Sequence, residues 1–257
     1  NIFLPKKWFP AVTPGTKYVT IGGMGASDVH GKNHHKNGSF ANYIEWLEIM
    51  NNNGEIIRCS KKENKNLFFW TLGGMGLTGI IINVAFFLKP IETSWIKQKL
   101  YVTKNIAQTF EFFEKNINST YSVAWIDCYS RNNNLGRSLL TLGEHANEED
   151  LKSCFNLEPF KYQKKTKISI PFFFPPFILN NLSVKIFNSI YFFSGKLSKK
   201  NKIVDWDSFF YPLDKILNWN KIYGYKGFIQ FQCVIPLLYS KKCISELLKC
   251  ISNSKSS

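Results

Sequence analysis

The run from Gly22 to Phe40 constrains the fold of this chain more than any other part. It reads Gly-Gly-Met-Gly-Ala-Ser-Asp-Val-His-Gly-Lys-Asn-His-His-Lys-Asn-Gly-Ser-Phe and holds three of the four histidines of the chain. Glycine has no Cβ atom and tolerates positive φ angles, so the backbone of such a run can approach a large ligand closely. Thr20 and Asn33 supply polar groups beside the glycines. The run predicts a cradle for a polar cofactor rather than a hydrophobic core.

The histidines of this run also raise the alternative of a zinc site. His30 and His34 are four residues apart, a spacing that can bind one metal ion from one face of a helix. Gly31 and Gly38 disfavour a helix, however, and no carboxylate or cysteine completes a ligand set. We expect no metal site, and hydrogen-bonded loop histidines remain the structural alternative to cofactor binding.

A second glycine motif, from Gly74 to Gly79, satisfies the pattern G-x-G-x-x-G. In a dinucleotide-binding fold this pattern joins a strand to a helix, and an acidic residue follows about twenty positions later. Here the apolar, β-branched run after Gly79 predicts a strand, and the only nearby acid, Glu92, lies beyond Pro90. The motif therefore does not predict a Rossmann fold.

The first 92 residues read as an α+β unit. Short apolar and β-branched runs bounded by turn residues predict strands, and a compact apolar run before a glycine pair predicts a helix. The expected strands are 17–21, 43–50, 55–59 and 80–88, and the expected helix is 67–72.

Residues 93–257 read as a second, incomplete α+β unit with an antiparallel sheet. Apolar residues recur at helical spacing from Ile106 to Ile117, and again from Ile244 to Ile251. Runs at 121–129, 138–142 and 228–235 predict strands, and alternation would place Gln230 and Gln232 on one face of the last one.

Basic residues dominate the charge of the chain, and they flank an aromatic segment. Lysine and arginine exceed acids by 33 to 18, which gives a net charge of +15. The charge suits a polyanion or an anionic membrane, or it reflects a compositional bias of the surface. The aromatic segment 168–193 lies between lysine clusters and is too interrupted to span a bilayer. It is expected to lie on a membrane surface, to cover a lipid chain, or to form a lid packed on protein.

Several motifs in order carry a resemblance to a known family. The chain resembles the FAD-linked oxidases of the vanillyl-alcohol oxidase superfamily, which have a PCMH-type FAD-binding domain, and within it the decaprenylphosphoryl-β-D-ribose 2-oxidases. The motifs are Gly15-Thr-Lys-Tyr-Val-Thr-Ile-Gly-Gly, Asp28-Val-His-Gly-Lys-Asn-His-His, Gly38-Ser-Phe, Gly73-Gly-Met-Gly-Leu-Thr-Gly-Ile-Ile, Ser122-Val-Ala-Trp-Ile-Asp, Leu135-Gly-Arg, Phe210-Tyr-Pro-Leu-Asp with Trp219-Asn, and Gly227-Phe-Ile-Gln-Phe-Gln-Cys-Val-Ile-Pro.

The resemblance implies FAD as the cofactor, held without a covalent bond. Amides of the Gly22-Gly23 turn and the hydroxyls of Thr20 and Ser27 would neutralise the pyrophosphate. The resemblance implies an FAD-binding domain at residues 1–92 and a substrate domain at residues 93–257. The implied cofactor contacts are Gly15, Thr20, Ile21, Gly22, Gly23, Ser27, Asp28, Val29, His30 and Ile81.

The resemblance also implies a reaction and a substrate pocket. The enzyme would oxidise the C2 hydroxyl of a polyprenyl-phosphoryl ribose to a 2-keto sugar, and an NADH-dependent keto-sugar reductase would complete epimerisation to arabinose for cell-wall arabinan. His30 would position the flavin or relay a proton, and Lys32 would bind the phosphate. We expect no nucleic-acid partner and a cytoplasmic protein with peripheral membrane contact. The implied substrate residues are Lys32, Trp125, Tyr211, Gln230 and Gln232.

Two other functions stay open at this point. The same core could oxidise soluble sugars or aldonolactones, or the chain could be a non-catalytic basic module that binds membranes or nucleic acid. We also expect the chain to be a fragment of a longer protein, without the N-terminal phosphate-binding loop and the C-terminal lysine segment of the family. By itself it is then expected to bind FAD weakly or not at all and to be inactive.

Overall fold

The chain forms two compact units, and each is described by itself. The computed structural model describes residues 2–152, 157–161, 167–175 and 177–254. Unit 1 consists of Asn1–Ile96, His145–Gln163 and Ile203–Asp214, and unit 2 of Lys97–Glu144, Lys164–Lys202 and Lys215–Ser257. The boundary expected between residues 92 and 93 lies near the end of the first segment of unit 1. Two later segments also belong to unit 1, which no local sequence pattern indicates.

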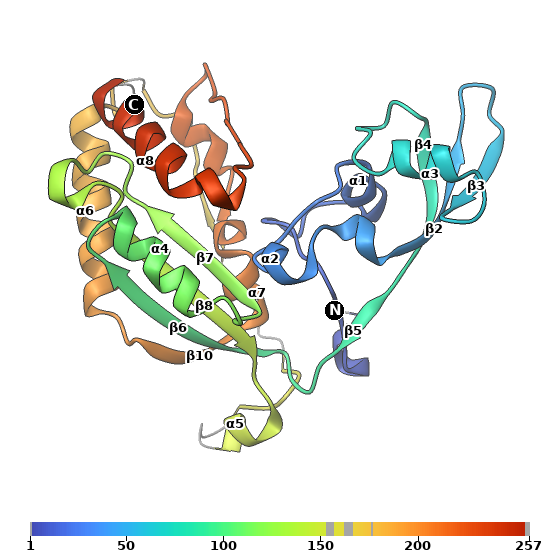
Figure 1. The fold of residues 1–257 in the computed structure, drawn as a ribbon, viewed down its shortest axis with the longest axis horizontal. Helices are drawn as coiled ribbons and strands as arrows, with labels where there is room; N and C mark the ends of the chain where they lie inside the picture. Colours follow the sequence, from blue (N-terminus) through green and yellow to red (C-terminus); the bar gives the residue numbers. More distant parts are fainter. Residues whose placement is uncertain (1, 153–156, 162–166, 176, 255–257) are drawn as a thin grey trace. The chain divides into compact units, whose positions relative to one another are not determined.

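A three-stranded antiparallel sheet forms the centre of unit 1. Its strand order is β3 (Ile56–Ser60), β2 (Ile44–Met50) and β4 (Ile80–Phe86), so the middle strand pairs with both others (Figure 1). Leu47, fully buried in β2, lies opposite Cys59 on one side and Val84 on the other. The core of this unit is built around these strands from Val12, Met24, Phe40, Ile44, Leu47, Ile49, Cys59 and Phe68.

Short helices and a strand pair complete unit 1. Strand β1 (Trp8–Pro10) pairs antiparallel with β5 (Leu88–Pro90). The α-helices are α1 (Ile21–Ala26), α2 (His34–Asn37), α3 (Lys65–Thr71), α5 (Glu148–Lys152) and α7 (Trp206–Phe210), and the 3₁₀ helices are η1 (Leu4–Lys6), η2 (Phe40–Tyr43) and η4 (Pro212–Lys215), whose last residue belongs to unit 2.

Unit 2 is built on a four-stranded sheet with a helix on each face. The strand order is β10 (Asn201–Asp205), β6 (Trp95–Thr103), β8 (Ser138–His145) and β7 (Tyr121–Ile126), and β7 and β8 are antiparallel. The strand ends at residues 95–96, 145 and 203–205 belong to unit 1. Leu100 of β6 is buried with Phe192 of α6 (Asn181–Leu197), whereas the next residue, Tyr101, has its ring 4.8 Å from that of Phe112 in α4 (Ile106–Lys115). Successive strand residues point to opposite faces, so α4 and α6 cover opposite faces of the sheet.

The rest of unit 2 lies around this sheet. Helix α8 (Leu237–Ser254) contacts α4, where Lys241 and Glu114 form an ion pair of 2.7 Å (Figure 1). The remaining elements are the parallel pair β9 (Ile168–Ser169) and β11 (Ile216–Leu217) and the 3₁₀ helices η3 (Asn132–Asn134) and η5 (Trp219–Tyr223).

Most elements predicted from local patterns are confirmed, but three expectations are wrong. The predicted strand at 17–21 is absent from this described segment, because Thr20 caps a helix there. Residues 228–235, all of them described, form no strand and pair with no neighbouring strand. A helix was judged improbable among the histidines, yet α2 forms one turn, which Gly38 ends with a φ of 67°.

Candidate functional site

The glycine run begins with the N-terminus of helix α1. Thr20 is the N-cap, with an extended backbone, and its Oγ1 accepts a hydrogen bond of 3.0 Å from the amide of Gly23. These two groups were both expected to face the cofactor, but here they satisfy each other within the helix. Thr20 and Gly23 remain exposed, so a ligand can approach this end of the helix.

Two glycines of α1 lie against the sheet of unit 1. A Cβ atom at Gly22 would lie 3.4 Å from the Cβ atom of Ile81, and one at Gly25 would lie 3.4 Å from Cδ1 of Ile44. The helix therefore rests directly on the strand. Two predicted cofactor residues, Gly22 and Ile81, are thus brought into contact, and their contact is one of helix-to-strand packing.

Asp28 and His30 follow α1 where the chain turns back. Asp28 adopts a φ of 40°, and its Oδ1 accepts a hydrogen bond of 2.8 Å from the amide of Ala41, which fixes the turn. His30 forms an isolated antiparallel bridge with Ser39, and its ring lies edge-on to the ring of His34 with centroids 5.6 Å apart. The His30 side chain is exposed and so remains available to a ligand.

Lys32 has the most unusual surroundings of the predicted site residues. Its Nζ donates a hydrogen bond of 2.8 Å to the carbonyl oxygen of Phe210 and lies 5.7 Å and 5.8 Å from the ring centroids of Phe209 and Phe210. Burial lowers the pKa of Lys32 to about 8, because desolvation disfavours the charged form. A half-buried cation of this kind suits an anionic ligand that replaces the water it has lost.

A polar link joins the loop before α1 to the segment after α7. The Thr16 hydroxyl and the Lys17 amide donate to the two carboxylate oxygens of Asp214, at 2.7 Å and 2.8 Å. The Lys17 ammonium also donates to Asp207, whose side chain is almost fully buried. This link holds residues that are nearly 200 positions apart in the sequence, and it fixes the backbone between Gly15 and Thr20.

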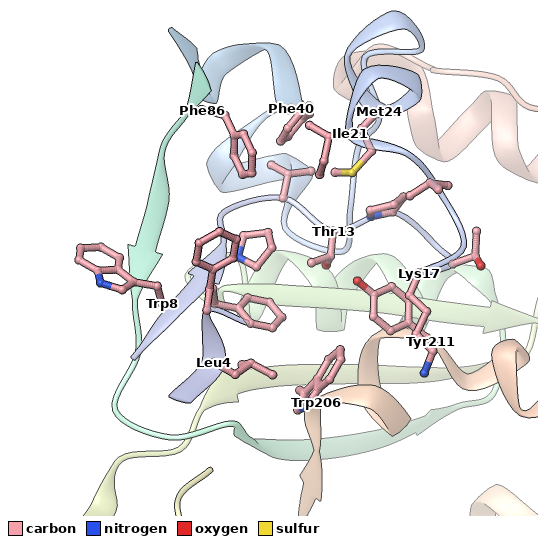
Figure 2. Close-up of a pocket in the computed structure, with 17 residues that line it drawn as sticks. Leu4, Trp8, Thr13, Lys17, Ile21, Met24, Phe40, Phe86, Trp206 and Tyr211 are labelled. Carbon is pink, nitrogen blue, oxygen red and sulfur yellow. The ribbon is translucent and has the colours of Figure 1, made fainter. Parts of the chain in front are cut away.

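A cavity of about 300 Å³ lies in unit 1 beside this link. Figure 2 shows Met24, Phe40 and Phe86 on one side of it and Leu4 and Trp206 on the other. Its few polar groups come from side chains such as Thr13, Thr16, Lys17 and Tyr211. Of the predicted site residues, Ile21 and Tyr211 line it. The lining residues are Phe3, Leu4, Trp8, Phe9, Pro10, Val12, Thr13, Pro14, Thr16, Lys17, Val19, Ile21, Met24, Phe40, Phe86, Trp206 and Tyr211.

Tyr211 lies in this cavity as a protonated phenol. Burial raises the pKa of its hydroxyl, and the carboxylates of Asp214 and Asp207 raise it further. The phenol therefore keeps its proton at neutral pH and can donate a hydrogen bond to a ligand.

The predicted substrate residues of unit 2 differ in their surroundings. Trp125 lies in β7 opposite Leu139, with its ring 4.8 Å from that of Tyr191 in α6, so it takes part in aromatic packing. Gln230 and Gln232 lie on the irregular segment before α8 and are exposed. The alternation that was to place both glutamines on one strand face does not apply, because there is no strand.

The predicted site residues therefore divide between the two units. Unit 2 holds Trp125, Gln230 and Gln232. Unit 1 holds Gly15, Thr20, Ile21, Gly22, Gly23, Ser27, Asp28, Val29, His30, Lys32, Ile81 and Tyr211.

Sequence reasoning missed the residues that join the two parts of the unit 1 site. Thr16, Lys17, Asp207 and Asp214 were assigned no role in the site. Their link depends on the return of residues 203–214 to unit 1. No local signal in the sequence indicates it, because the link joins segments nearly 200 positions apart.

The described residues contain neither a metal-binding cluster nor a membrane-spanning helix. In the part of the chain that the structure describes, no group of three or more histidine, cysteine or acidic side chains could hold a metal ion. None of the described helices combines the length and apolar character that crossing a bilayer requires.

Comparisons with known proteins find an FAD-binding domain and two long similarities. Residues 1–60 match the model of the FAD binding domain. The chain is 34% identical to the decaprenylphosphoryl-β-D-ribose oxidase of Mycolicibacterium smegmatis over 232 residues, which are 89% of this chain and 50% of that protein. It is 30% identical to an uncharacterised protein of Streptomyces coelicolor over 160 residues, 62% of this chain and 43% of that one.

More distant similarity is confined to a shorter region. Cytokinin dehydrogenase 5 of Arabidopsis thaliana is 33% identical over 96 residues, 36% of this chain and 17% of that enzyme. The chain spans about half the length of the first curated relatives it matches. The α+β fold, the matched domain and the relatives agree: the chain is similar to the FAD-linked oxidases with a PCMH-type FAD-binding domain, and FAD is the cofactor of the matched domain.

Proposed function

We propose that the protein is an FAD-dependent oxidoreductase that oxidises the C2 hydroxyl of a polyprenyl-phosphoryl ribose to the 2-keto sugar. Similarity to decaprenylphosphoryl-β-D-ribose oxidase over 89% of the chain supports this reaction. When bound, FAD supplies N5 of its ring as the acceptor of the C2 hydride. The observation that carries the proposal is Lys32, a half-buried ammonium group held beside Phe210 in the unit that has the cofactor motif.

The cavity of unit 1 fits one part of the cofactor. Its walls are largely apolar with a few polar groups, as in most sites for planar ring systems. At about 300 Å³ it has room for a ring system and not for a whole dinucleotide. Ile21 and Met24 on one side and Tyr211 on the other would hold the ring. The remaining proposed cofactor contacts are Gly15, Thr20, Gly22, Gly23, Ser27, Asp28, Val29, His30 and Ile81.

Lys32 is proposed to bind the phosphate of the substrate. Its ammonium now makes one hydrogen bond of 2.8 Å, to the carbonyl of Phe210, and has two further donor positions. A charge-assisted hydrogen bond to phosphate is about twice as strong as a neutral one, and the partial burial of Lys32 strengthens it further. The Phe210 carbonyl would keep the ammonium oriented toward the ligand.

His30 is proposed to act at the reacting hydroxyl. Oxidation of a secondary alcohol removes a hydride from carbon and a proton from oxygen, so the proton needs an acceptor or a relay. His30 is exposed and lies two residues before Lys32, and its backbone is held by the bridge to Ser39. Trp125, Gln230 and Gln232 stay proposed wall residues of the substrate pocket. An NADH-dependent keto-sugar reductase is the proposed consumer of the product.

The test is an anaerobic absorption titration of the purified full-length protein with FAD bound. Addition of a polyprenyl-phosphoryl ribose is expected to bleach the flavin band, and a Lys32→Met variant is expected to need a much higher concentration. A Lys36→Met variant, which changes an exposed lysine of the same run, is the matched control and should behave as the unchanged protein.

Each other outcome contradicts a defined part of the proposal. Bleaching by soluble sugars or aldonolactones, with none by the lipid-linked ribose, would overturn the substrate and keep the oxidoreductase. A protein that binds no flavin would overturn the enzymatic function altogether.

A further inference from the structure

Helix α6 has an apolar stripe on the side opposite to its buried face. The buried residues are Asn188, Phe192 and Gly195, and a Cβ atom at Gly195 would lie 2.5 Å from the side chain of Leu139, so this face fits closely on the sheet. The stripe residues follow spacings of four, four, three and four, which places them within an arc of about 80° over about 22 Å of helix. They are Leu182, Ile186, Ile190, Phe193 and Leu197, and each is more than half exposed.

The helix is specified by its own sequence and does not need a partner to form. Asn180 caps its N-terminus through hydrogen bonds to the amides of Leu182 and Ser183, and the Ser183 hydroxyl accepts from the Asn180 amide in return. Asn188 also donates a buried hydrogen bond of 2.8 Å to Asp127 of unit 2. The orientation of the stripe is therefore set by the cap and the inner face, and its exposure is a stable feature of unit 2.

The charge around the stripe has one sign. Between Glu158 and Asp205 the sequence contains nine lysines and no acidic residue. Lys185 and Lys196 lie beside the stripe on the helix and are exposed, and the Lys196 ammonium lies 5.9 Å from the Phe193 ring centroid. Long lysine side chains can lie along an apolar surface while their ammonium groups reach outward.

We propose that α6 binds flat on an anionic lipid bilayer, with the stripe among the acyl chains near the surface and the lysines at the head groups. An apolar helix face bordered by lysines is the pattern of interfacial helices. The single sign of charge is complementary to anionic lipids. This inference uses none of the cofactor chemistry, so it is independent of the proposed reaction.

The test is co-sedimentation of the full-length protein with vesicles. Binding is expected to vesicles of mixed phosphatidylcholine and phosphatidylglycerol, to weaken as salt rises and to be far weaker with phosphatidylcholine alone. An Ile186→Gln, Ile190→Gln double variant should lose about tenfold in affinity or more. The matched control is Ile56→Gln, Ile80→Gln, which changes isoleucines of similar exposure in unit 1 and should bind as the unchanged protein.

A second pair of variants tests the role of charge. Lys185→Gln, Lys196→Gln should weaken binding severalfold for the anionic vesicles only, whereas Lys61→Gln, Lys62→Gln should have much less effect. Thermal unfolding of every variant checks that the fold is retained.

Three results would overturn the proposal. Equal binding of the Ile186→Gln, Ile190→Gln variant and the control would exclude the stripe as the contact. A dimer that depends on Ile186 and Ile190 would show a second copy as the occupant. A strong loss of stability in that variant, without a change in vesicle binding, would show that another segment of the protein covers α6.

Discussion

Each unit contains a polar network built on a buried aspartate, and the two networks differ in what lies beside them. In unit 2, Asp127 accepts hydrogen bonds from Ser130, Arg137, Asn188 and the Tyr129 amide. Burial by itself would raise the pKa of Asp127, but these hydrogen bonds lower it below its usual value. This network leaves the carboxylate no capacity for a ligand, and it ties β7 to the start of β8 and to α6.

The network of unit 1 lies beside a cavity. The same unit contains Lys32, whose positive charge is costly because it is partly buried. Asp207 and Asp214 fix the loop at Thr16 and Lys17, while Lys32 lies half-buried on the carbonyl of Phe210 with a lowered pKa. An ionisable group whose pKa is strongly shifted from its usual value is typical of functional sites. We infer that the Asp127 network serves stability, and we propose that the Lys32 region serves binding.

The largest effect on stability is expected from Asp127→Ala. The change leaves Arg137 and Asn188 without their partner in the interior, so the free energy of unfolding should fall by about 4 kcal/mol. Urea unfolding measures it. The matched control is Glu111→Ala, which removes a carboxylate from an exposed ion pair with Lys115 and should leave the midpoint unchanged. Equal effects of the two changes would contradict the structural role of Asp127.

The second prediction concerns the pH dependence that Lys32 confers. Its pKa is about 8 in the folded protein and 10.5 for an unperturbed lysine, so the folded state disfavours its charge at neutral pH. Below pH 8 the buried charge of Lys32 lowers the free energy of unfolding. Between pH 8 and 10.5 the unfolded chain binds more protons than the folded protein, so the free energy of unfolding rises again with pH. Relative to Lys32→Met, the unchanged protein should gain about 2 kcal/mol between pH 7 and pH 10. A constant difference across this range would contradict the burial of Lys32.

Asp214→Asn is expected to change the free energy of unfolding by less than the two effects above. An asparagine keeps one oxygen acceptor, so either the Thr16 hydroxyl or the Lys17 amide loses its partner, at a cost of about 1 kcal/mol. Because the loop carries Gly15 and Thr20, flavin affinity should fall together with the melting temperature. A fluorescence titration with FAD measures the first effect. If the variant is measurably destabilised but its flavin affinity is unchanged, Asp214 does not support flavin binding.

The smallest effect on stability is expected from Gln230→Ala, Gln232→Ala. Both side chains are exposed on an irregular segment, so the free energy of unfolding should change by less than about 0.5 kcal/mol. If the glutamines bind the sugar, KM should rise in the same variant. An unchanged KM would remove them from the proposed pocket.

Local signals explain which parts of the fold were predictable. β2, β3, β4, α3, α4, β7, β8 and α8 lie close to their predicted positions, because alternation and helical spacing act over a few residues. The failure at residues 17–21 is also local, since the N-cap role of Thr20 was overlooked in favour of β-branched composition. The glycine run was recognised as unusual, although two of its glycines, Gly22 and Gly25, lie against the sheet of unit 1.

Long-range pairing explains what could not be predicted. Residues 228–235 alternate like a strand, but alternation does not supply a neighbouring strand, and without one the backbone stays irregular. In the same way, the contact of Lys32 with Phe210 and of Thr16 with Asp214 depends on the return of 203–214 to unit 1. No periodicity in either segment encodes that return.

The most direct test of the central claim is the rate of flavin bleaching with deuterated substrate in a single anaerobic turnover. The full-length protein with FAD bound would be mixed with polyprenyl-phosphoryl ribose that carries deuterium at C2 or, as a control, at C3. The account predicts slower bleaching with the C2 deuterium and an unchanged rate with the C3 deuterium. Bleaching that is equally fast with both, or absent with both, would contradict oxidation at C2.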